Sequence, residues 1–312
     1  MRNKRILWFL LLAVAALALL ATACGGEEEE AEIITTEVAA TPLPEEEEAE
    51  ITATEVAPTP LPEEEEEAPL PEEDEVLPEE SPVMAEFGRV ILLHHSVGAD
   101  LIARGGVRES LTNLGYEFYD HGYNGDGLVL ADGTSTGENF DVPDDNTNPD
   151  GFANIFAQPL NDPPDNTFSQ LMQYDVIAFK SCFPVSDIQS DEQLAEYKTY
   201  YLSIRDRMDE YPNKIFIVVT QPPQVSANTD PETAARARAF SDWLASDEYL
   251  SGHPNVFTFN FFDLLADPST NTLQADYVAD EYDAHPNELA DQTIAPLFAD
   301  FIDQSVKTYT AQ

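Results

Sequence analysis

The residues best suited to chemistry follow an apolar run about a quarter of the way along the chain. Residues 90–93 are Val-Ile-Leu-Leu, and His94, His95 and Ser96 come directly after them. Such a run predicts a buried strand, and in open α/β sheets ligands bind at the carboxyl ends of the strands. Ser96 is therefore a candidate nucleophile. A serine in this place is equally suited to cap the following helix.

A second apolar run ends in Phe179, Lys180, Ser181 and Cys182. A cysteine at the end of a strand is a candidate nucleophile. Cysteine is also among the most buried residue types and then behaves as a small apolar side chain. Both interpretations of Cys182 stay open at this point.

Histidines and carboxylates are also found near the expected strand ends and in the last loop. Because zinc accepts both kinds of ligand, His95, His121 and His285 with Asp120 or Asp126 form a candidate metal set. No His-x-x-x-His or similar spacing supports this set. We therefore expect no metal ion and no other cofactor.

Apolar runs alternate with helical patterns over residues 84–312. The runs are short, continuous and rich in β-branched or aromatic residues, which is typical of strands buried on both faces. Apolar residues at helical spacing predict helices between them. The expected strands are 89–94, 116–120, 175–179, 214–220 and 256–261, and the expected helices are 191–211, 231–250 and 287–306.

This alternation favours a mostly parallel sheet covered by helices on both sides, which is a three-layer α/β/α sandwich. The 229 residues of 84–312 suffice for one domain with a substantial core. Residues 122–166 are rich in Gly, Asp, Asn and Pro and lack periodicity. We expect them to form a long ordered loop over the edge of the sheet.

The amino-terminal residues have the pattern of an export signal, which we assign to residues 1–23. A basic start is followed by the apolar run 6–20 and the small residues Ala-Thr-Ala at 21–23. This triplet with Cys24 resembles the lipobox of bacterial lipoproteins, which implies cleavage before Cys24 and a lipid on its sulfur. The alternative is a simple signal peptide with an incidental cysteine. The resemblance implies a cell-envelope protein that faces away from the cytoplasm and contacts the membrane through this lipid.

Residues 24–83 predict a disordered acidic tether. Most of them are Glu, Pro, Ala or Thr, none is aromatic, and residues 31–38 recur as 49–56 with small changes. Such a segment buries too little apolar surface to offset the entropy lost on ordering. The whole chain has a net charge of −46, and residues 25–83 hold 23 of its 60 acidic residues. The remaining excess of acid excludes nucleic acid as an expected partner.

Four short motifs in residues 88–306 resemble the SGNH or GDSL hydrolases, whose domain has a flavodoxin-like sheet. Ser96 matches the position of the family's nucleophile, although His95 replaces the Asp of the Gly-Asp-Ser motif. Residues 121–127, His-Gly-Tyr-Asn-Gly-Asp-Gly, resemble the second block. The resemblance implies that the backbone amides of Ser96 and Gly125 bind the oxyanion. A simple tight turn is the alternative for these glycines.

The third block departs most from the family, because Cys182 stands where an oxyanion-binding asparagine is found. A thiol is a weak donor, so either Ser181, Lys180 or a backbone amide takes over its role, or the oxyanion hole is weak. The fourth block is the best match and implies that His285 is the general base. A histidine that merely packs at the start of the last helix is the alternative.

The family's acid lies three residues before its histidine, and Tyr282 occupies that position here. Asp283 is the first choice to orient His285, with Asp280 and Glu281 as substitutes. These motifs together imply a surface-tethered serine hydrolase that cleaves a small ester or an acetylated glycan. The altered motifs also favour a different class of protein, a non-catalytic lipoprotein that binds a glycan or another ligand with the same fold.

Overall fold

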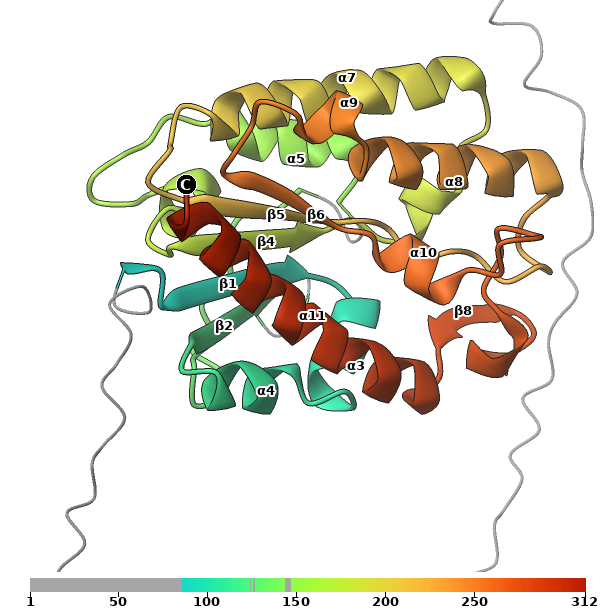
Figure 1. The fold of residues 1–312 in the computed structure, drawn as a ribbon, viewed down its shortest axis with the longest axis horizontal. Helices are drawn as coiled ribbons and strands as arrows, with labels where there is room; N and C mark the ends of the chain where they lie inside the picture. Colours follow the sequence, from blue (N-terminus) through green and yellow to red (C-terminus); the bar gives the residue numbers. More distant parts are fainter. Residues whose placement is uncertain (1–85, 124, 126, 144–146) are drawn as a thin grey trace, which may run out of the picture. The chain divides into compact units, whose positions relative to one another are not determined.

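The computed structural model describes residues 86–123, 125, 127–143 and 147–312. The proposed signal peptide, the lipidation site Cys24 and the whole tether lie outside these residues. Within the described part the chain forms an α/β domain whose central sheet has the order β3-β2-β1-β4-β5-β6 (Figure 1). All neighbours in this sheet run parallel except β3, which is antiparallel to β2. The predicted fold class is therefore confirmed.

The six strands of the sheet are β1 (Arg89–His94), β2 (Glu117–Gly122), β3 (Gly127–Val129), β4 (Val176–Lys180), β5 (Ile215–Val219) and β6 (Val256–Phe259). A separate two-stranded antiparallel sheet consists of β7 (Val278–Asp280) and β8 (Asp283–Pro286). The helices are α3 (Val97–Ala103), α4 (Val107–Asn113), α5 (Pro149–Phe156), α6 (Thr167–Leu171), α7 (Asp191–Met208), α8 (Pro231–Leu244), α9 (Asp247–Leu250), α10 (Phe261–Leu265) and α11 (Glu288–Thr310).

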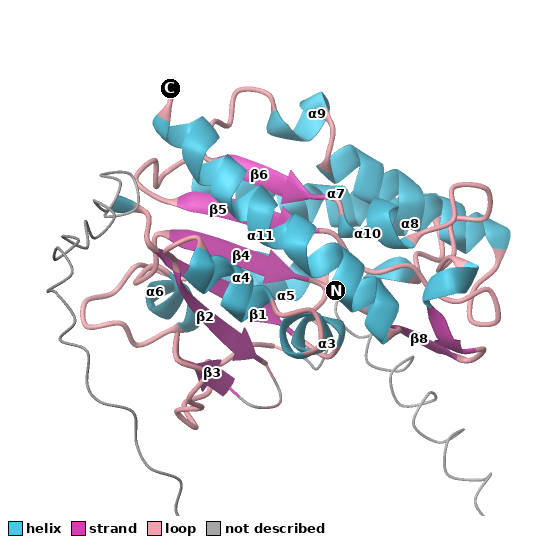
Figure 2. Ribbon diagram, turned by 60° about the horizontal axis from the view of Figure 1, so that its bottom comes forward, coloured by secondary structure: helices cyan, strands magenta, loops and turns pink. Residues whose placement is uncertain are grey.

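Two apolar cores lie on the two faces of the sheet. Side chains alternate along a strand, so Val90 and Leu92 of β1 belong to one core whereas Ile91 and Leu93 belong to the other. The first core contains α3, α4 and α11, and the second contains α5, α7 and α8. Helices accordingly cover both faces of the strands (Figure 2). Burial on both faces explains why these strands are continuous apolar runs.

The ends of the helices follow from local capping. Asp230 accepts hydrogen bonds from two backbone N–H groups of the first turn of α8, and Pro231 begins that helix. Asn287 caps α11 in the same way, through the N–H of Ala290 at 3.1 Å. None of the helices in the described ranges is long and apolar enough to cross a membrane.

Two expectations about secondary structure are wrong. Residues 122–166 are not one loop, because they contain β3 and the eight-residue helix α5, whose Phe152, Ile155 and Phe156 are buried. The expected helix 231–250 is divided into α8 and α9 at Ser246. The hydroxyl of Ser246 donates to the carbonyl of Trp243, and such local side-chain bonds compete with a continuous helix.

Candidate functional site

The sheet has a topological switch point between β1 and β4. The chain leaves β1 into α3 and α4, which pack on one face, and leaves β4 toward α7, which packs on the other. In open α/β sheets such a point leaves a crevice beyond the carboxyl ends of the two strands, where ligands bind. Ser96 follows β1 and Cys182 follows β4, so these two candidates flank the switch point.

Ser96 has a strained backbone. Its φ is 25° and its ψ is −87°, and Asn271 is the other non-glycine residue with positive φ in the described part of the chain. Such a conformation is unfavourable for a residue with a Cβ and is found most often at functional sites. Ser96 occupies the N-cap position of α3, but its side chain makes no capping bond. Its hydroxyl instead lies 3.5 Å from Cys182 Sγ, so helix capping does not explain this serine.

The thiol of Cys182 belongs to a buried charged cluster. Cys182 and Lys180 are 0% and 1% exposed, and their alternation on the strand puts them on the same side. Burial raises the pKa of the thiol, but the Lys180 ammonium and hydrogen bonds from His95 and Ser96 outweigh burial and lower it to about 6. Burial lowers the pKa of Lys180, and the thiolate opposes this effect. Lys180 and its neighbours therefore favour the thiolate form of Cys182.

Ser181 and His95, two further residues considered in the sequence analysis, lie beside this cluster. Lys180 Nζ donates to the Ser181 carbonyl at 3.0 Å, and the Ser181 hydroxyl lies 3.2 Å from the hydroxyl of Tyr201. The ring of His95 stacks on Tyr123, with centroids 5.4 Å apart. The hydroxyl of Tyr123 in turn donates to the Lys180 carbonyl at 3.1 Å. Ser181 therefore faces away from Ser96 into the core, whereas His95 faces the thiol.

Gly125 is exposed and its N–H is engaged in a turn. It donates to the carbonyl of Gly122 at 3.3 Å. The N–H of Ser96, in contrast, has no backbone partner among the described residues. Ser96 is therefore the better placed of the two predicted backbone donors in this conformation.

His285 and Asp283 form a hydrogen-bonded pair on β8. His285 Nδ1 lies 2.6 Å from Asp283 Oδ1, and the same oxygen accepts the His285 backbone N–H at 3.0 Å. These two bonds, with the backbone bond dominant, lower the pKa of Asp283. Asp280 instead accepts the backbone N–H of Tyr282. Of the three acids considered, Asp283 is the one bonded to His285, while Glu281 is exposed on the same hairpin.

Ser96 and His285 approach the same short segment from two directions. Ser96 contacts Cys182, and the ring of His285 packs edge-on against Phe183, with centroids 5.2 Å apart. Among the described residues no direct hydrogen bond joins Ser96 to His285. The two candidates are thus neighbours of Cys182 and Phe183. Catalytic hydrogen bonds are often open in the absence of substrate.

The alternative metal set is not assembled. The described residues contain no group of three His, Cys, Asp or Glu side chains that could hold an ion, and Asp126 lies outside them. His121 is fully buried, stacks on Phe140 and accepts the Phe140 backbone N–H at 2.8 Å. Burial, with the nearby charge of His94, lowers the pKa of His121 to about 4. His121 is therefore a neutral core residue.

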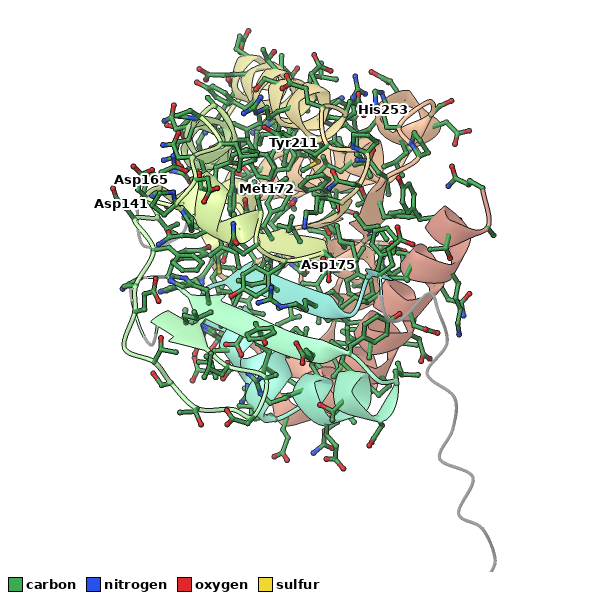
Figure 3. All side chains as sticks on the ribbon, turned by 90° about the vertical axis from the view of Figure 1, so that its left-hand side faces the viewer. Asp141, Asp165, Met172, Asp175, Tyr211 and His253 are labelled. Carbon is green, nitrogen blue, oxygen red and sulfur yellow. The ribbon has the colours of Figure 1, made fainter. Side chains whose placement is uncertain are left out.

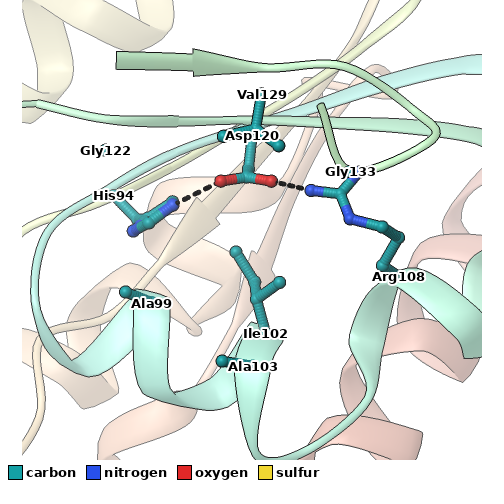
Figure 4. A pocket seen from close by; sticks show the side chains of 9 residues that line it. All are labelled: His94, Ala99, Ile102, Ala103, Arg108, Asp120, Gly122, Val129 and Gly133. Carbon is teal, nitrogen blue, oxygen red and sulfur yellow. Dashed lines mark hydrogen bonds and ion pairs between the residues drawn. The ribbon is translucent and has the colours of Figure 1, made fainter. Parts of the chain in front are cut away.

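A pocket of about 230 Å³ lies beside the site, between α3 and the β2–β3 edge of the sheet. Figure 4 shows three polar side chains of this pocket bonded in a row: Asp120 lies 3.1 Å from His94 Nε2 and pairs with Arg108 (Figure 4). The guanidinium of Arg108 also donates to the Phe118 carbonyl at 2.6 Å and to the Leu130 carbonyl at 2.7 Å. These mutual bonds fix β2 and β3 against α4 and offer few free polar groups to a ligand.

The opposite end of the sheet contains none of the candidates. Figure 3 faces this end, where Asp175, Tyr211 and His253 lie in segments that precede β4, β5 and β6 (Figure 3). His253 bonds to Asp209 at 2.7 Å and is an ordinary residue of a connection. The chemistry-bearing residues are therefore segregated at the carboxyl ends of the strands.

Two residues at the site were missed by the sequence analysis. Tyr123 supports His95 and Lys180, and Phe183 packs on His285. Both are aromatic residues directly beside a proposed block, Tyr123 within the glycine-rich segment and Phe183 after Cys182. That position was the available signal, but an aromatic side chain beside a strand end is more often part of a core.

No family profile and no curated protein matches the sequence. Solved structures do resemble the domain. One is a protein named an acylhydrolase from Bacteroides fragilis, with 11% identity, a TM-score of 0.45 and coverage of 70% of this chain and 88% of that one. A GDSL-like lipase from Bacteroides thetaiotaomicron has 10% identity, a TM-score of 0.41 and coverage of 72% and 90%.

A family two carbohydrate esterase from Cellvibrio japonicus is a third similar structure. It has 15% identity, a TM-score of 0.37 and coverage of 70% of this chain and 62% of that one. Identities at this level concern the fold and not the activity. With TM-scores below 0.5, these likenesses assign neither a family nor an activity to the chain.

Proposed function

We propose that this domain is a serine-type ester hydrolase in which Ser96 is the nucleophile, His285 the general base and Asp283 the residue that orients His285. One observation carries the proposal: Ser96 and the His285–Asp283 pair converge on Cys182 and Phe183 at the switch point. A serine needs an adjacent base, and a carboxylate on the other ring nitrogen holds that base in the required tautomer.

The bonding of His285 assigns a task to each of its nitrogens. Because Nδ1 is bonded to Asp283, Nε2 is the nitrogen that accepts the Ser96 proton. Ser96 Oγ then attacks the carbonyl carbon of the ester, and the proton passes to the leaving alcohol. Water attacks the resulting acyl-serine, gives its proton to His285 and releases the carboxylic acid. Ser96 regains its proton, so the cycle closes.

The oxyanion would form close to the Cys182 thiol. The N–H of Ser96, which has no backbone partner within the described ranges, is one donor for it, and the protonated thiol is a second, weaker one. A thiolate there would repel the oxyanion, and the Lys180 ammonium would offset only part of that repulsion. We therefore expect hydrolysis to be faster in the protonated state of Cys182 than in its thiolate state.

The substrate in this proposal is a small ester or an acetylated glycan. Asp283 is 57% exposed and His285 is 37% exposed by side chain, so a bulky substrate can reach the base from solvent. The acidic net charge disfavours anionic polymers as substrates.

Attachment to the membrane through a lipid on Cys24 is also part of the proposal, with residues 24–83 as the tether and the domain outside the cytoplasm. It rests on the sequence pattern described above. Replacement of Cys24 by Ser is expected to move the protein out of the membrane fraction. Equal amounts of the variant and the wild type in that fraction would contradict the lipoprotein assignment.

A non-catalytic ligand-binding protein is the second candidate function. It is favoured by the turn that occupies the Gly125 N–H and by the cysteine in place of an oxyanion-binding asparagine. A third arrangement, with Cys182 as nucleophile, is favoured by its lowered pKa but opposed by its complete burial.

One set of assays separates these candidates. The full chain in detergent would be assayed with short-chain acyl esters and acetylated oligosaccharides, and would be treated with a serine-directed fluorophosphonate. Hydrolysis and labelling that Ser96→Ala removes and Cys182→Ala retains support the serine mechanism. The opposite pattern identifies the thiol as the nucleophile. Glycan binding without hydrolysis favours the second candidate.

A further inference from the structure

Arg104 connects the two elements that carry the proposed nucleophile and base. Its Nη2 lies 2.8 Å from Asp291 Oδ2 and 2.9 Å from Asp100 Oδ2, and it donates to the Pro286 carbonyl at 3.1 Å. Arg104 directly follows α3, whereas Pro286 and Asp291 lie at the end of β8 and in the first turn of α11. One nitrogen therefore joins three segments of the chain.

Each of these segments is next to a proposed catalytic residue. Ser96 immediately precedes α3, a seven-residue helix about 10 Å long whose C-cap is Arg104. His285 immediately precedes Pro286, whose carbonyl accepts the Arg104 hydrogen bond. A change at Arg104 is thus transmitted to Ser96 through one short helix and to His285 through one peptide unit.

Close packing supports the same connection. A Cβ on Gly105 would lie 2.5 Å from Ala295 Cβ and 2.7 Å from the Asp291 carbonyl oxygen, so the end of α3 touches α11 there. Such an approach requires glycine. The spacing between the Ser96 helix and the helix that follows His285 is therefore set by direct contact.

The two partners of the Arg104–Asp291 ion pair differ in burial. Asp291 is 1% exposed by side chain, whereas Arg104 is 37% exposed. Although Arg104 Nη2 is close, Asp291 Oδ2 has no well-aligned hydrogen bond. Burial raises the pKa of Asp291 to about 7. The negative charges of Asp100 and Glu288 raise it further, whereas the positive charge of Arg104 lowers it. Arg104 thus opposes the effect of burial on the pKa of Asp291.

We propose that Arg104 is a positioning residue that holds the β8 segment against α3 and so keeps His285 facing Ser96. This proposal rests on the proposed function. A base displaced by about 1 Å can cost about a hundredfold in rate, so a residue that fixes it has a large effect without touching the substrate. The paired side chain, Asp291, acts by holding Arg104.

The variants are chosen so that no buried charge is left alone. The double variant Arg104→Met with Asp291→Asn removes both charges, and Arg104→Lys keeps the positive charge but replaces the planar guanidinium with a more compact ammonium. Arg89→Met is the matched control, because Arg89 lies at the other end of β1 and bonds to the Gln173 carbonyl. The full chain in detergent would be used throughout, with thermal unfolding measured for each variant.

The expected result is a fall in kcat of roughly 10- to 100-fold for the double variant, with KM changed by less than about threefold. Arg104→Lys should lie between the double variant and the wild type, and Arg89→Met should match the wild type. A double variant that folds and has a kcat within about twofold of the wild type would overturn the proposal. If the double variant does not fold, Arg104→Lys takes its place in the test: a kcat within about twofold of the wild type would then overturn the proposal.

A readout without catalysis separates this proposal from the proposed function. The imidazole NMR signals of His285, identified by their absence in His285→Gln, report its orientation even in a protein that hydrolyses nothing. Signals that shift or broaden in the double variant, but not in Arg89→Met, support the positioning role. Signals identical to those of the wild type overturn it. An inactive wild type with shifted signals would refute the hydrolase while leaving the positioning role intact.

Discussion

The two halves of the candidate site are built in different ways. The nucleophile half lies at the ends of central strands, where Cys182 is 0% exposed and Lys180 is 1% exposed. The base half lies on the two-stranded β7–β8 sheet, where the side chains of His285 and Asp283 are 37% and 57% exposed. The first half is held by the core of the domain. The second half is anchored to that core through Ala284 of β8, but its functional side chains lie at the surface.

This difference indicates where each half is sensitive. Charges in the buried half interact strongly, because little water screens them, and they shift one another's pKa values. Charges in the exposed half are screened, so orientation matters more there than field strength. We therefore expect changes in the buried half to alter titration and changes in the exposed half to alter rate through geometry.

The largest effect is expected from removing either proposed catalytic side chain. Ser96→Ala and His285→Ala should each lower kcat by about a thousandfold or more, and the double variant should be little worse than either single variant. Non-additivity of this kind would show that the two halves act as one unit. Losses that multiply in the double variant would show that they act separately. Steady-state hydrolysis of a short-chain ester measures this.

A smaller loss is expected when the orienting carboxylate is removed. Asp283→Ala should lower kcat by roughly 10- to 100-fold, because His285 loses its Nδ1 partner but remains on the hairpin. Asp280→Ala is the control and should leave kcat nearly unchanged, since Asp280 is bonded to the Tyr282 backbone. Equal losses in both variants would mean that the stability of the hairpin, and not the carboxylate at Asp283, is the cause.

In the buried half, we expect a substitution at Lys180 to change the pKa of the Cys182 thiol. Lys180→Met removes the ammonium that lowers the pKa of Cys182 to about 6, so that pKa should rise by about one unit or more. Ultraviolet absorbance of the thiolate against pH measures the midpoint, and Cys182→Ser supplies the baseline. An unchanged midpoint would show that His95 and Ser96 stabilise the thiolate without Lys180.

The same titration predicts a pH dependence of the rate. If the thiolate repels the oxyanion, kcat should fall as the pH rises through about 6, where Cys182 loses its proton. Cys182→Ser, which stays neutral, should lack this limb of the pH profile. If the fall in kcat with rising pH persists in Cys182→Ser, a group other than the Cys182 thiol causes it.

The smallest expected effect concerns stability. Because burial raises the pKa of Asp291 from its ordinary 3.8 to about 7, the folded state binds the proton more tightly than the unfolded state. The stability from this group is complete below about pH 4 and is lost as the pH rises through about 7. Relative to Asp291→Asn, the wild type should therefore be about 2–3 kcal/mol more stable at about pH 5 than at about pH 8. Denaturant unfolding at the two pH values measures the difference, and a constant difference would contradict it.

Elements with a strong local pattern were predicted well. The expected strand 89–94 has the observed bounds of β1, and the expected helix 191–211 differs from α7 only at its end. Both depend on burial patterns that repeat over many residues. The strands β3, β7 and β8 have three or four residues each, which is too few to show an alternation, so they were not predicted.

Some site features also follow from local sequence. Asp283 is two residues from His285, and the tight β8 geometry lets one carboxylate oxygen contact both the backbone and the ring of His285. The preference for Asp283 over Asp280 could thus be stated in advance. The separate roles of Asp280 and Asp283 follow from the β7–β8 pairing, which brings them opposite each other.

The sequence by itself determined the alternation of strands and helices, the two-sided burial of the strands and the residue types at their ends. These are properties of short stretches, because burial and side-chain chemistry are encoded within a few residues. Only the tertiary structure decided that β1 lies beside β4, which brings Ser96 to Cys182 across 86 positions, and that Arg104 reaches Pro286 across 182. Strand order and helix packing depend on the free energy of the whole core, and no single segment of the chain contains that information.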